Sequence, residues 1–229
     1  EKVSAGRRFG LVIYDECHHA AAEDNKRVLA ELGCFEPDWG GTLLGFTATP
    51  TRADGIGLDE VFEEIAYSRD LSEMVEDGFL VRLRGFRVTT VADLQAVRPA
   101  GRDLDVEALA TAVDVEERNA LVARSIQELA RDRRTIAFCV TIAHATNLAR
   151  SLNAVGVAAG VIHGNLRPED RARVLEEFRS EQLQVLTNVG VLTEGFDDPG
   201  VSCIAMARPL CLREPAAGKL GLSPHGLRG

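Results

Sequence analysis

The sequence predicts an α/β fold built on parallel sheets. Three observations support this prediction. Short apolar runs that resemble buried strands recur along the chain, helical patterns separate them in its second half, and polar clusters follow several of them directly. In folds of this class the functional groups lie just past the carboxyl ends of the strands.

Two strand-like runs lie in the first part of the chain. Residues 9–14 (FGLVIY) end in the polar cluster DECHH, and residues 42–46 (TLLGF) end in TATP. Continuous apolar strands of this kind suit a parallel sheet that is covered on both faces. We therefore expect both polar clusters at one edge of a first sheet.

The alternation of strands and helices returns in the second half. Residues 82–114 break the rhythm and are interpreted as a connection with partial structure. Beyond it the patterns predict helices over 116–131, 143–153 and 168–179, and strands over 135–140, 158–162, 183–186 and 201–207. Gly156 is expected to end the second of these helices, and Pro168 suits the first turn of the third.

Length and composition limit the class of protein. A chain of 229 residues with 45% hydrophobic and 27% charged residues can form one large globular domain or two smaller ones. No apolar run approaches the roughly 18 residues that span a membrane. The N-terminus, EKVS, has neither an initiator Met nor an apolar signal core. We therefore expect an internal section of a longer protein, located in the cytoplasm, with no membrane contact.

Charge and cysteine content exclude two further classes. The net charge of −9 argues against a protein coated in basic surface, although local basic groups, hydroxyls and helix N-termini can still follow a nucleic-acid backbone. The five cysteines are odd in number and include no C-x-x-C pair. This argues against a disulfide framework or zinc site and predicts reduced, mostly buried thiols.

Asp15 and Glu16 are adjacent acids at the end of a buried strand. Such a pair is costly unless positive charge compensates it, and magnesium with nucleotide phosphates would do so. Asp15 would then hold the metal, and Glu16 could orient or deprotonate the attacking water. The alternative is a solvated loop after a strand.

Two hydroxyl-bearing clusters follow other strands. Thr47 and Thr49 end the second strand, where their hydroxyls can bond the imidazole of His18; the alternative is a hydroxyl-rich turn. The third cluster, residues 187–197 (TNVGVLTEGFD), offers the Thr187 and Thr193 hydroxyls and a carboxylate. Its glycine allows close approach of the backbone to a ligand, and the alternative is a β-to-α loop with a turn.

Taken in order, these segments resemble superfamily 2 helicases of the DEAD/DEAH-box and type III restriction-subunit branch. Residues 11–20 resemble motif II, 45–52 motif III, 135–153 motif IV and its helix, and 186–197 motif V. Residues 72–81 resemble the helix and "dGfL" segment that closes the first lobe, and 163–178 the "HG…R…F" segment. The likeness covers nearly all of 9–209.

The resemblance implies a fold and a set of roles. The fold would be two RecA-like lobes of the P-loop NTPase type, with ATP and Mg²⁺ between them and a strand of single- or double-stranded nucleic acid running across both. Asp15 would hold magnesium through water, Glu16 would be the catalytic base, and His18, Thr47 and Thr49 would couple ATP state to strand movement. The residues implied for the second lobe are Gly195 and Asp197 facing the nucleotide, and Thr187, Thr193 and His144 contacting nucleic acid.

The chain departs from the family pattern at both ends. No G-x-x-x-x-G-K-[ST] precedes Asp15, and after residue 209 no Q-x-x-G-R-x-x-R appears. We therefore expect residues 1–85 to be the C-terminal part of an incomplete first lobe, 86–115 a linker, 116–209 the second lobe, and 210–229 an atypical disordered tail. The parent activity would be ATP-driven helicase or translocase action, with DNA favoured over RNA.

Several features have plain structural interpretations. His144 is as consistent with a surface histidine as with a strand contact, and Arg131, Arg133 and Arg134 fit a solvated helix end. Trp39 is interpreted as a loop anchor, with stacking on a base as the alternative. Two rival functions also stay open, namely a non-catalytic nucleic-acid- or protein-binding remnant of a helicase, and a nucleotide hydrolase that does not use nucleic acid.

Overall fold

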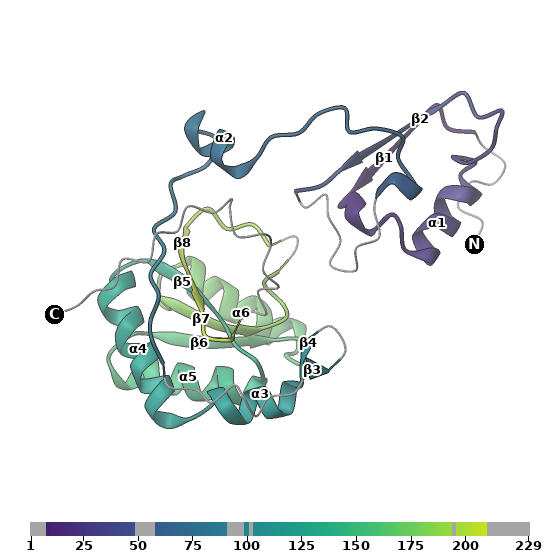
Figure 1. Cartoon of the computed structure of the whole chain (residues 1–229). Coiled ribbons are helices and arrows are strands. Elements are labelled where there is room, and N and C mark those ends of the chain that lie inside the picture. Colours follow the sequence, from purple (N-terminus) through teal and green to yellow (C-terminus); the bar gives the residue numbers. More distant parts are fainter. Residues whose placement is uncertain (1–7, 49–57, 91–98, 101–102, 194–195, 210–229) are drawn as a thin grey trace. The chain divides into compact units, whose positions relative to one another are not determined.

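A computed structural model describes residues 8–48, 58–90, 99–100, 103–193 and 196–209. The chain divides into two units, Glu1–Arg84 and Gly85–Gly229, and each is considered by itself. Figure 1 labels the elements of both. In the described ranges no helix has the length and apolar character needed to cross a bilayer.

The first unit contains the two predicted strands, β1 (Leu11–Asp15) and β2 (Thr42–Phe46). They pair in parallel, with Leu11 opposite Thr42 and Asp15 opposite Phe46. A 3-10 turn (Cys17–His19) and α1 (Glu23–Glu31) connect them, and α1 is not among the helices that the sequence predicts. The expected parallel arrangement therefore brings the ends of both strands to one edge.

Two short helical elements follow β2. A 3-10 turn covers Leu58–Glu60, and α2 covers Leu71–Glu76. A capping box begins α2, because Asp70 accepts from the Glu73 backbone N–H while the Glu73 side chain accepts from that of Asp70. This helix begins within one residue of the segment at 72–81 that the family resemblance indicated.

One glycine on β2 permits close packing in the first unit. A Cβ at Gly45 would lie 2.5 Å from the Phe62 ring and 2.8 Å from the Cys17 Cβ. Only a residue without a side chain therefore lets the loop after β1 and the 58–62 segment pack against the strand. The expectation that this sheet is covered on both faces is wrong for the described residues, because Ile13 and Phe46, on the alternate positions of the strands, are 62% and 56% exposed.

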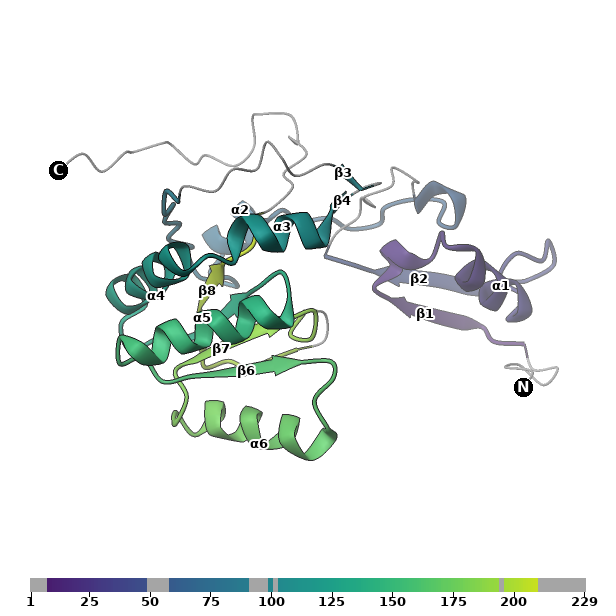
Figure 2. The ribbon, with the colours of Figure 1, turned by 90° about the horizontal axis from the view of Figure 1, so that it is seen from below.

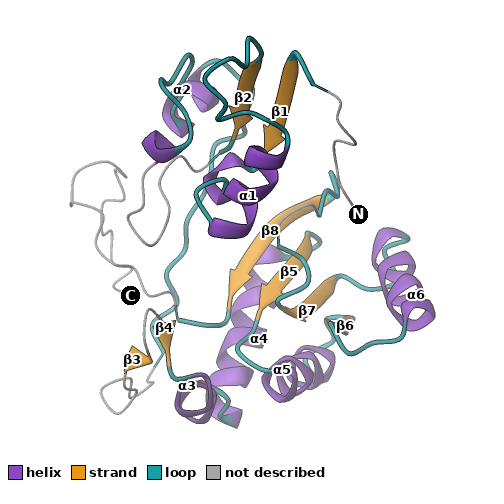
Figure 3. Cartoon of the chain, turned by 90° about the vertical axis from the view of Figure 1, so that its right-hand side faces the viewer, coloured by secondary structure: helices purple, strands orange, loops and turns teal. Residues whose placement is uncertain are grey.

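The second unit is built on a four-stranded parallel sheet with the order β6-β7-β5-β8 (Figure 3). Its strands are β5 (Arg134–Phe138), β6 (Ala159–His163), β7 (Val185–Val189) and β8 (Val201–Met206). Its helices are α3 (Val106–Val113), α4 (Glu116–Ala130), α5 (Ile142–Ala154) and α6 (Pro168–Arg179). A small antiparallel pair, β3 (Pro99–Ala100) and β4 (Asp103–Leu104), precedes α3.

Helices cover both faces of this sheet, with α4 and α5 on one side and α6 on the other (Figure 2). The two-residue period of the strands divides the core accordingly, because Ala137 of β5 packs with α4 and α5 whereas its neighbour Ile136 packs with Phe178 of α6. The predicted fold class, α/β with parallel sheets, is confirmed.

The ends of the second-unit helices also follow the sequence. Gly156 has a φ of +82°, a left-handed conformation that glycine adopts without strain, and it ends α5 as predicted. Pro168 begins α6, also as predicted. The strand expected over 183–186 is shifted, since β7 begins at Val185 and continues to Val189.

The expected linker contains a helix that belongs to the second unit. Leu109 and Val113 of α3 are 2% and 0% exposed. The Asp114 carboxylate after them accepts hydrogen bonds from Asn119 of α4 and Asn147 of α5. These contacts tie the end of residues 86–115 to the helices of the second unit. The tail over 210–229, expected to be disordered, lies outside the described residues.

Candidate catalytic and coupling site

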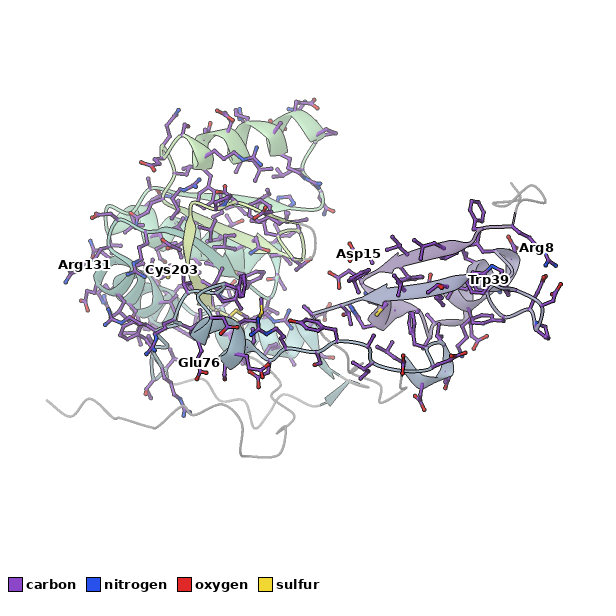
Figure 4. All side chains as sticks on the ribbon, turned by 90° about the horizontal axis from the view of Figure 1, so that it is seen from above. Arg8, Asp15, Trp39, Glu76, Arg131 and Cys203 are labelled. Atoms are coloured by element: carbon purple, nitrogen blue, oxygen red, sulfur yellow. The ribbon has the colours of Figure 1, made fainter. Side chains whose placement is uncertain are left out.

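Asp15 ends β1 with its side chain exposed (Figure 4). Its Oδ1 accepts a hydrogen bond from the Glu16 backbone N–H at 3.0 Å. This bond fixes one carboxylate oxygen at the carboxyl end of the strand, which is the edge where parallel sheets bind ligands.

Glu16 has a strained backbone. Its φ and ψ are 51° and 48°, in the left-handed region that residues with a side chain rarely adopt. Strain of this kind costs on the order of 1–3 kcal/mol and gathers at functional sites. The turn at Glu16 leads directly into the 3-10 turn Cys17–His19, in which the Cys17 side chain is buried. No sequence signal indicated it, because glutamate is not a residue type that favours this conformation.

The His18 imidazole joins the ends of the two strands. Its Nδ1 lies 2.9 Å from the Thr47 hydroxyl oxygen and 3.3 Å from Oε2 of Glu16. The predicted hydrogen bond between His18 and Thr47 is therefore confirmed. Thr49, the second expected partner, lies outside the described residues. Glu16, His18 and Thr47 therefore form one connected group at the ends of β1 and β2. The coupling role of His18 and Thr47 stays a prediction.

The opposite end of these strands is braced by Trp39 and Arg8 (Figure 4). The Trp39 indole N–H donates to the Phe9 carbonyl at 2.7 Å, and Arg8 pairs with Glu36 and Asp38. Trp39 is thus the loop anchor that the sequence indicated. Its hydrogen bond to Phe9 connects the loop that precedes β2 to the residues that precede β1.

In the second unit, Asp197 and Thr193 keep the exposure that their predicted roles require. Both side chains are exposed on the segment that follows β7. Gly195, the third predicted residue of this segment, lies outside the described residues. The nucleotide role of Asp197 and the nucleic-acid role of Thr193 remain predictions.

Two predicted nucleic-acid contacts are wrong in this structure. Thr187 is 0% exposed, and its hydroxyl donates to the Ala145 and Gly160 carbonyls at 2.9 and 3.2 Å. It lies within β7 on the face that α5 covers, so its side chain supports the core. His144 is also 0% exposed, which contradicts both the strand contact and the surface alternative.

His144 instead holds the loop between β5 and α5. Its Nδ1 accepts a hydrogen bond from the Val140 backbone N–H at 3.3 Å, and Thr141 caps α5 by accepting from the His144 N–H. Burial lowers the pKa of His144 to about 4; Asp114 opposes the shift and Arg118 adds to it. The imidazole is therefore neutral at physiological pH.

Arg134 also departs from its expected role. The sequence analysis grouped it with Arg131 and Arg133 as a solvated helix end, but the Arg134 side chain is 14% exposed and pairs with Asp198 at 2.7 Å. The difference arises because Arg134 is the first residue of β5 and its guanidinium packs between Asp198 and Phe178, whereas Arg131 and Arg133 precede the strand and are exposed.

The acids at the end of β1 fit a hydrated magnesium ion. No group of three or more His, Cys, Asp or Glu side chains that could enclose a metal occurs among the described residues. Magnesium commonly takes only one or two carboxylates, keeps several waters and completes its shell with phosphate oxygens. A single exposed Asp15 carboxylate with Glu16 beside it is the donor set that this mode of binding requires.

Comparisons with known proteins agree with the order of these segments. The helicase conserved C-terminal domain matches residues 117–210, and the res subunit of type III restriction enzymes matches residues 1–52. The Schizosaccharomyces pombe protein named "Putative mitochondrial ATP-dependent helicase irc3" is 32% identical over 197 residues, which cover 86% of this chain and 32% of that protein.

A restriction enzyme subunit and a solved structure are also similar to this chain. A type I restriction enzyme EcoAI endonuclease subunit of Escherichia coli is 31% identical over 63% of this chain and 19% of its own length. Saccharomyces cerevisiae Dbp5 bound to RNA and ADP BeF3 is 17% identical, with a TM-score of 0.47 over 90% of this chain and 46% of that one. The chain spans about a third of the length of the irc3 helicase of Schizosaccharomyces pombe.

One matched model lies in each unit, and the two follow the order in which motif II, motif III and motif V occur in the sequence. The chain therefore belongs to the superfamily 2 helicases of the DEAD/DEAH-box and type III restriction-subunit kind.

Proposed function

We propose that this chain supplies the hydrolysis and coupling residues of an ATP-driven nucleic-acid helicase or translocase. The observation that supports this most directly is the connected group of Glu16, His18 and Thr47 at the ends of β1 and β2. A change in the position of Glu16 can be transmitted to Thr47, at the end of β2, through the imidazole of His18. Coupling of the nucleotide state to movement of nucleic acid requires a connection of this kind.

In the proposed reaction, Asp15 would hold Mg²⁺ through water, and Glu16 would orient or deprotonate the water that attacks the terminal phosphate. When bound, the ion would supply positive charge against the phosphate oxygens. His18 keeps the Glu16 carboxylate in place, since its Nδ1 lies 3.3 Å from Oε2. Asp197 is the residue of the second unit that we propose to contact nucleotide, and its side chain is exposed.

The proposed partner is nucleic acid, with DNA favoured over RNA. The similarity of residues 1–52 to the restriction res subunit and the type I restriction relative support DNA. Thr193, which is exposed, is the remaining predicted contact. With a net charge of −9, binding would depend on local groups and be sensitive to salt. The cytoplasm is the proposed location.

This chain by itself is proposed to have no ATPase activity. Its sequence contains no phosphate-cradling G-x-x-x-x-G-K-[ST] loop before Asp15 and no arginine motif after residue 209. Arginines of this kind contribute on the order of a thousandfold or more in rate, and the phosphate loop contributes most of the binding of nucleotide. Purified chain with magnesium-ATP and single-stranded DNA should release no phosphate above a Glu16→Gln control.

The catalytic assignment is tested in the full-length protein that carries this sequence. Glu16→Gln should abolish ATP turnover while nucleotide binding persists, because the amide keeps the shape of the side chain but cannot accept a proton. Glu31→Gln, an exposed glutamate at the end of α1, is the matched control and should keep the parent rate. ATP hydrolysis by Glu16→Gln at the parent rate would remove Glu16 from the role of base.

The alternative is a non-catalytic nucleic-acid- or protein-binding remnant of a helicase. The two buried residues that were expected to contact nucleic acid, Thr187 and His144, give it no support. Absence of ATP turnover in the unmodified full-length protein, together with retained binding of nucleic acid, would favour this alternative.

A further inference from the structure

Arg134 makes a set of contacts that no part of the proposed reaction uses. Its Nη2 donates to Oδ1 of Asp198 at 2.7 Å and its Nη1 to Oδ2 at 3.3 Å, which is a two-pronged pairing of guanidinium and carboxylate. The guanidinium carbon also lies 5.3 Å from the centre of the Phe178 ring. These contacts connect β5, the end of α6 and the segment that precedes β8.

The pair is almost entirely withdrawn from water. The Arg134 and Asp198 side chains are 14% and 6% exposed. Breaking a buried pair by removing one partner costs more than losing a surface pair, because the remaining charge loses its compensation. For Asp198 only a weaker contact would remain, with Nε of the exposed Arg179 side chain at 4.0 Å from Oδ2. The same Asp198 carboxylate accepts from the Gly200 backbone N–H at 3.0 Å, so it fixes the backbone on its own C-terminal side as well.

The position of the Arg134 guanidinium leaves no room for a side chain at Gly200. A Cβ at this position would lie 1.1 Å from Nη2 of Arg134, which is an overlap and not a contact. The guanidinium therefore occupies the space that a side chain at position 200 would take. The backbone of 198–200 and the Arg134 side chain are fitted to each other.

Asp197 lies directly before this anchor. Its carboxylate is exposed, whereas that of Asp198 is enclosed by Arg134. On the other side, Phe196 packs against the core formed by Ile136 and Phe178. Asp197 is therefore held between an apolar contact and an ion pair, with only its own side chain directed to water.

We propose that Arg134 is a positioning residue that fixes the 196–200 segment through Asp198 and thereby sets the affinity for nucleotide. The proposal rests on the function proposed above, in which Asp197 faces the nucleotide. Without the ion pair the segment would occupy other positions, and apparent affinity would fall in proportion to the competent fraction. Once nucleotide is bound, the hydrolytic residues of the first unit would act as before.

The first test measures ATP hydrolysis by the full-length protein. Arg134→Ala and Asp198→Asn should raise the KM for ATP by about tenfold and leave kcat within about twofold. The reason is that these variants lower the fraction of molecules that can bind nucleotide but do not change the hydrolytic step. Arg134→Lys keeps the charge but not the two-pronged pairing, so its KM should lie between those of Arg134→Ala and the parent. Arg133→Ala, an exposed neighbour, should leave both constants unchanged.

Gly200→Ala tests the same contact from the opposite side. In the parent it should displace the guanidinium and raise the KM as Arg134→Ala does. In an Arg134→Ala background the space is empty, so the added methyl should cause no further change. Independent effects of Gly200→Ala and Arg134→Ala that multiply in the double variant would overturn the proposal, as would an equal loss of kcat in Arg134→Ala.

Amide hydrogen exchange separates this proposal from the proposed function. In this chain, Arg134→Ala should speed exchange at Gly200 and Val201, whose N–H groups donate to the side chain and the carbonyl of Asp198, while the amides of β7 keep the parent rates. If the unmodified full-length protein hydrolyses no ATP, the proposed function fails and this comparison alone decides whether Arg134 holds the segment. Unchanged exchange at Gly200 and Val201, or equal acceleration throughout β7, would show that Arg134 does not hold this segment.

Discussion

His144 should make the stability of the second unit depend on pH. The residue is 0% exposed, and burial lowers its pKa from 6.5 to about 4, with Asp114 opposing and Arg118 adding to the shift. Above pH 6.5 the imidazole is neutral in both the folded and the unfolded chain, so it causes no pH dependence there. Between pH 6.5 and 4 only the unfolded chain takes up the proton, and the folded state loses stability as the pH falls.

The magnitude follows from the size of the shift. A change from 6.5 to about 4 corresponds to about 3 kcal/mol between pH 7 and pH 4. Carboxylates also titrate in this range, so the histidine contribution has to be isolated by a variant. His144→Asn removes the titrating ring and keeps an acceptor that can reach the Val140 N–H.

Urea unfolding followed by far-ultraviolet circular dichroism measures this effect, because α3 to α6 all belong to the second unit. Tryptophan fluorescence would not serve, since the one tryptophan, Trp39, is in the first unit. The free energy of unfolding of the parent should fall by about 3 kcal/mol more than that of His144→Asn between pH 7 and pH 4. Parallel pH profiles for the two proteins would refute the reasoning.

Three further changes test other contacts. Thr47→Val in the full-length protein should leave ATP hydrolysis largely intact but reduce the number of base pairs unwound per ATP hydrolysed. If an unwinding assay gives the same number for the variant and the parent, the coupling role is excluded. Phe178→Ala should lower the free energy of unfolding by about 3–5 kcal/mol in urea, and the exposed Leu129→Ala by under about 1, because only the first leaves a cavity between sheet and helix. Gly45→Ala should destabilise the first unit by about 1–3 kcal/mol, as followed by tryptophan fluorescence, whereas Gly40→Ala, with open space around it, should not; equal effects would contradict the packing described.

The strands and most second-unit helices could be predicted because their signals are local. Apolar runs, the helix stop at Gly156 and the start at Pro168 depend on neighbouring residues alone. The bond between His18 and Thr47 was also within reach, since parallel pairing of the two strands brings their carboxyl ends together. α1 was missed because its sequence, EDNKRVLAE, is largely polar and has only one buried residue, Leu29.

The errors concern which face or environment a side chain has. Thr187 follows the strand predicted over 183–186, but it lies in the middle of β7 with its hydroxyl bonded to α5. His144 is buried, and Asp114 after α3 and Arg118 of α4 act on its pKa. The local sequence indicates neither environment. The ion pair of Arg134 and Asp198 joins residues far apart in the chain, so neither local pattern could indicate the other. The left-handed Glu16 is a product of the packing around it, which periodicity cannot express.

The measurement that tests the central claim most directly is the stimulation of ATP hydrolysis by nucleic acid in the full-length protein. Phosphate release would be followed at low salt with single-stranded DNA, with single-stranded RNA of the same sequence, and with neither. The account predicts that turnover rises severalfold with nucleic acid, more with DNA than with RNA, and that Glu16→Gln abolishes it. Turnover of equal rate with and without nucleic acid would contradict the account and identify a nucleotide hydrolase that does not act on nucleic acid.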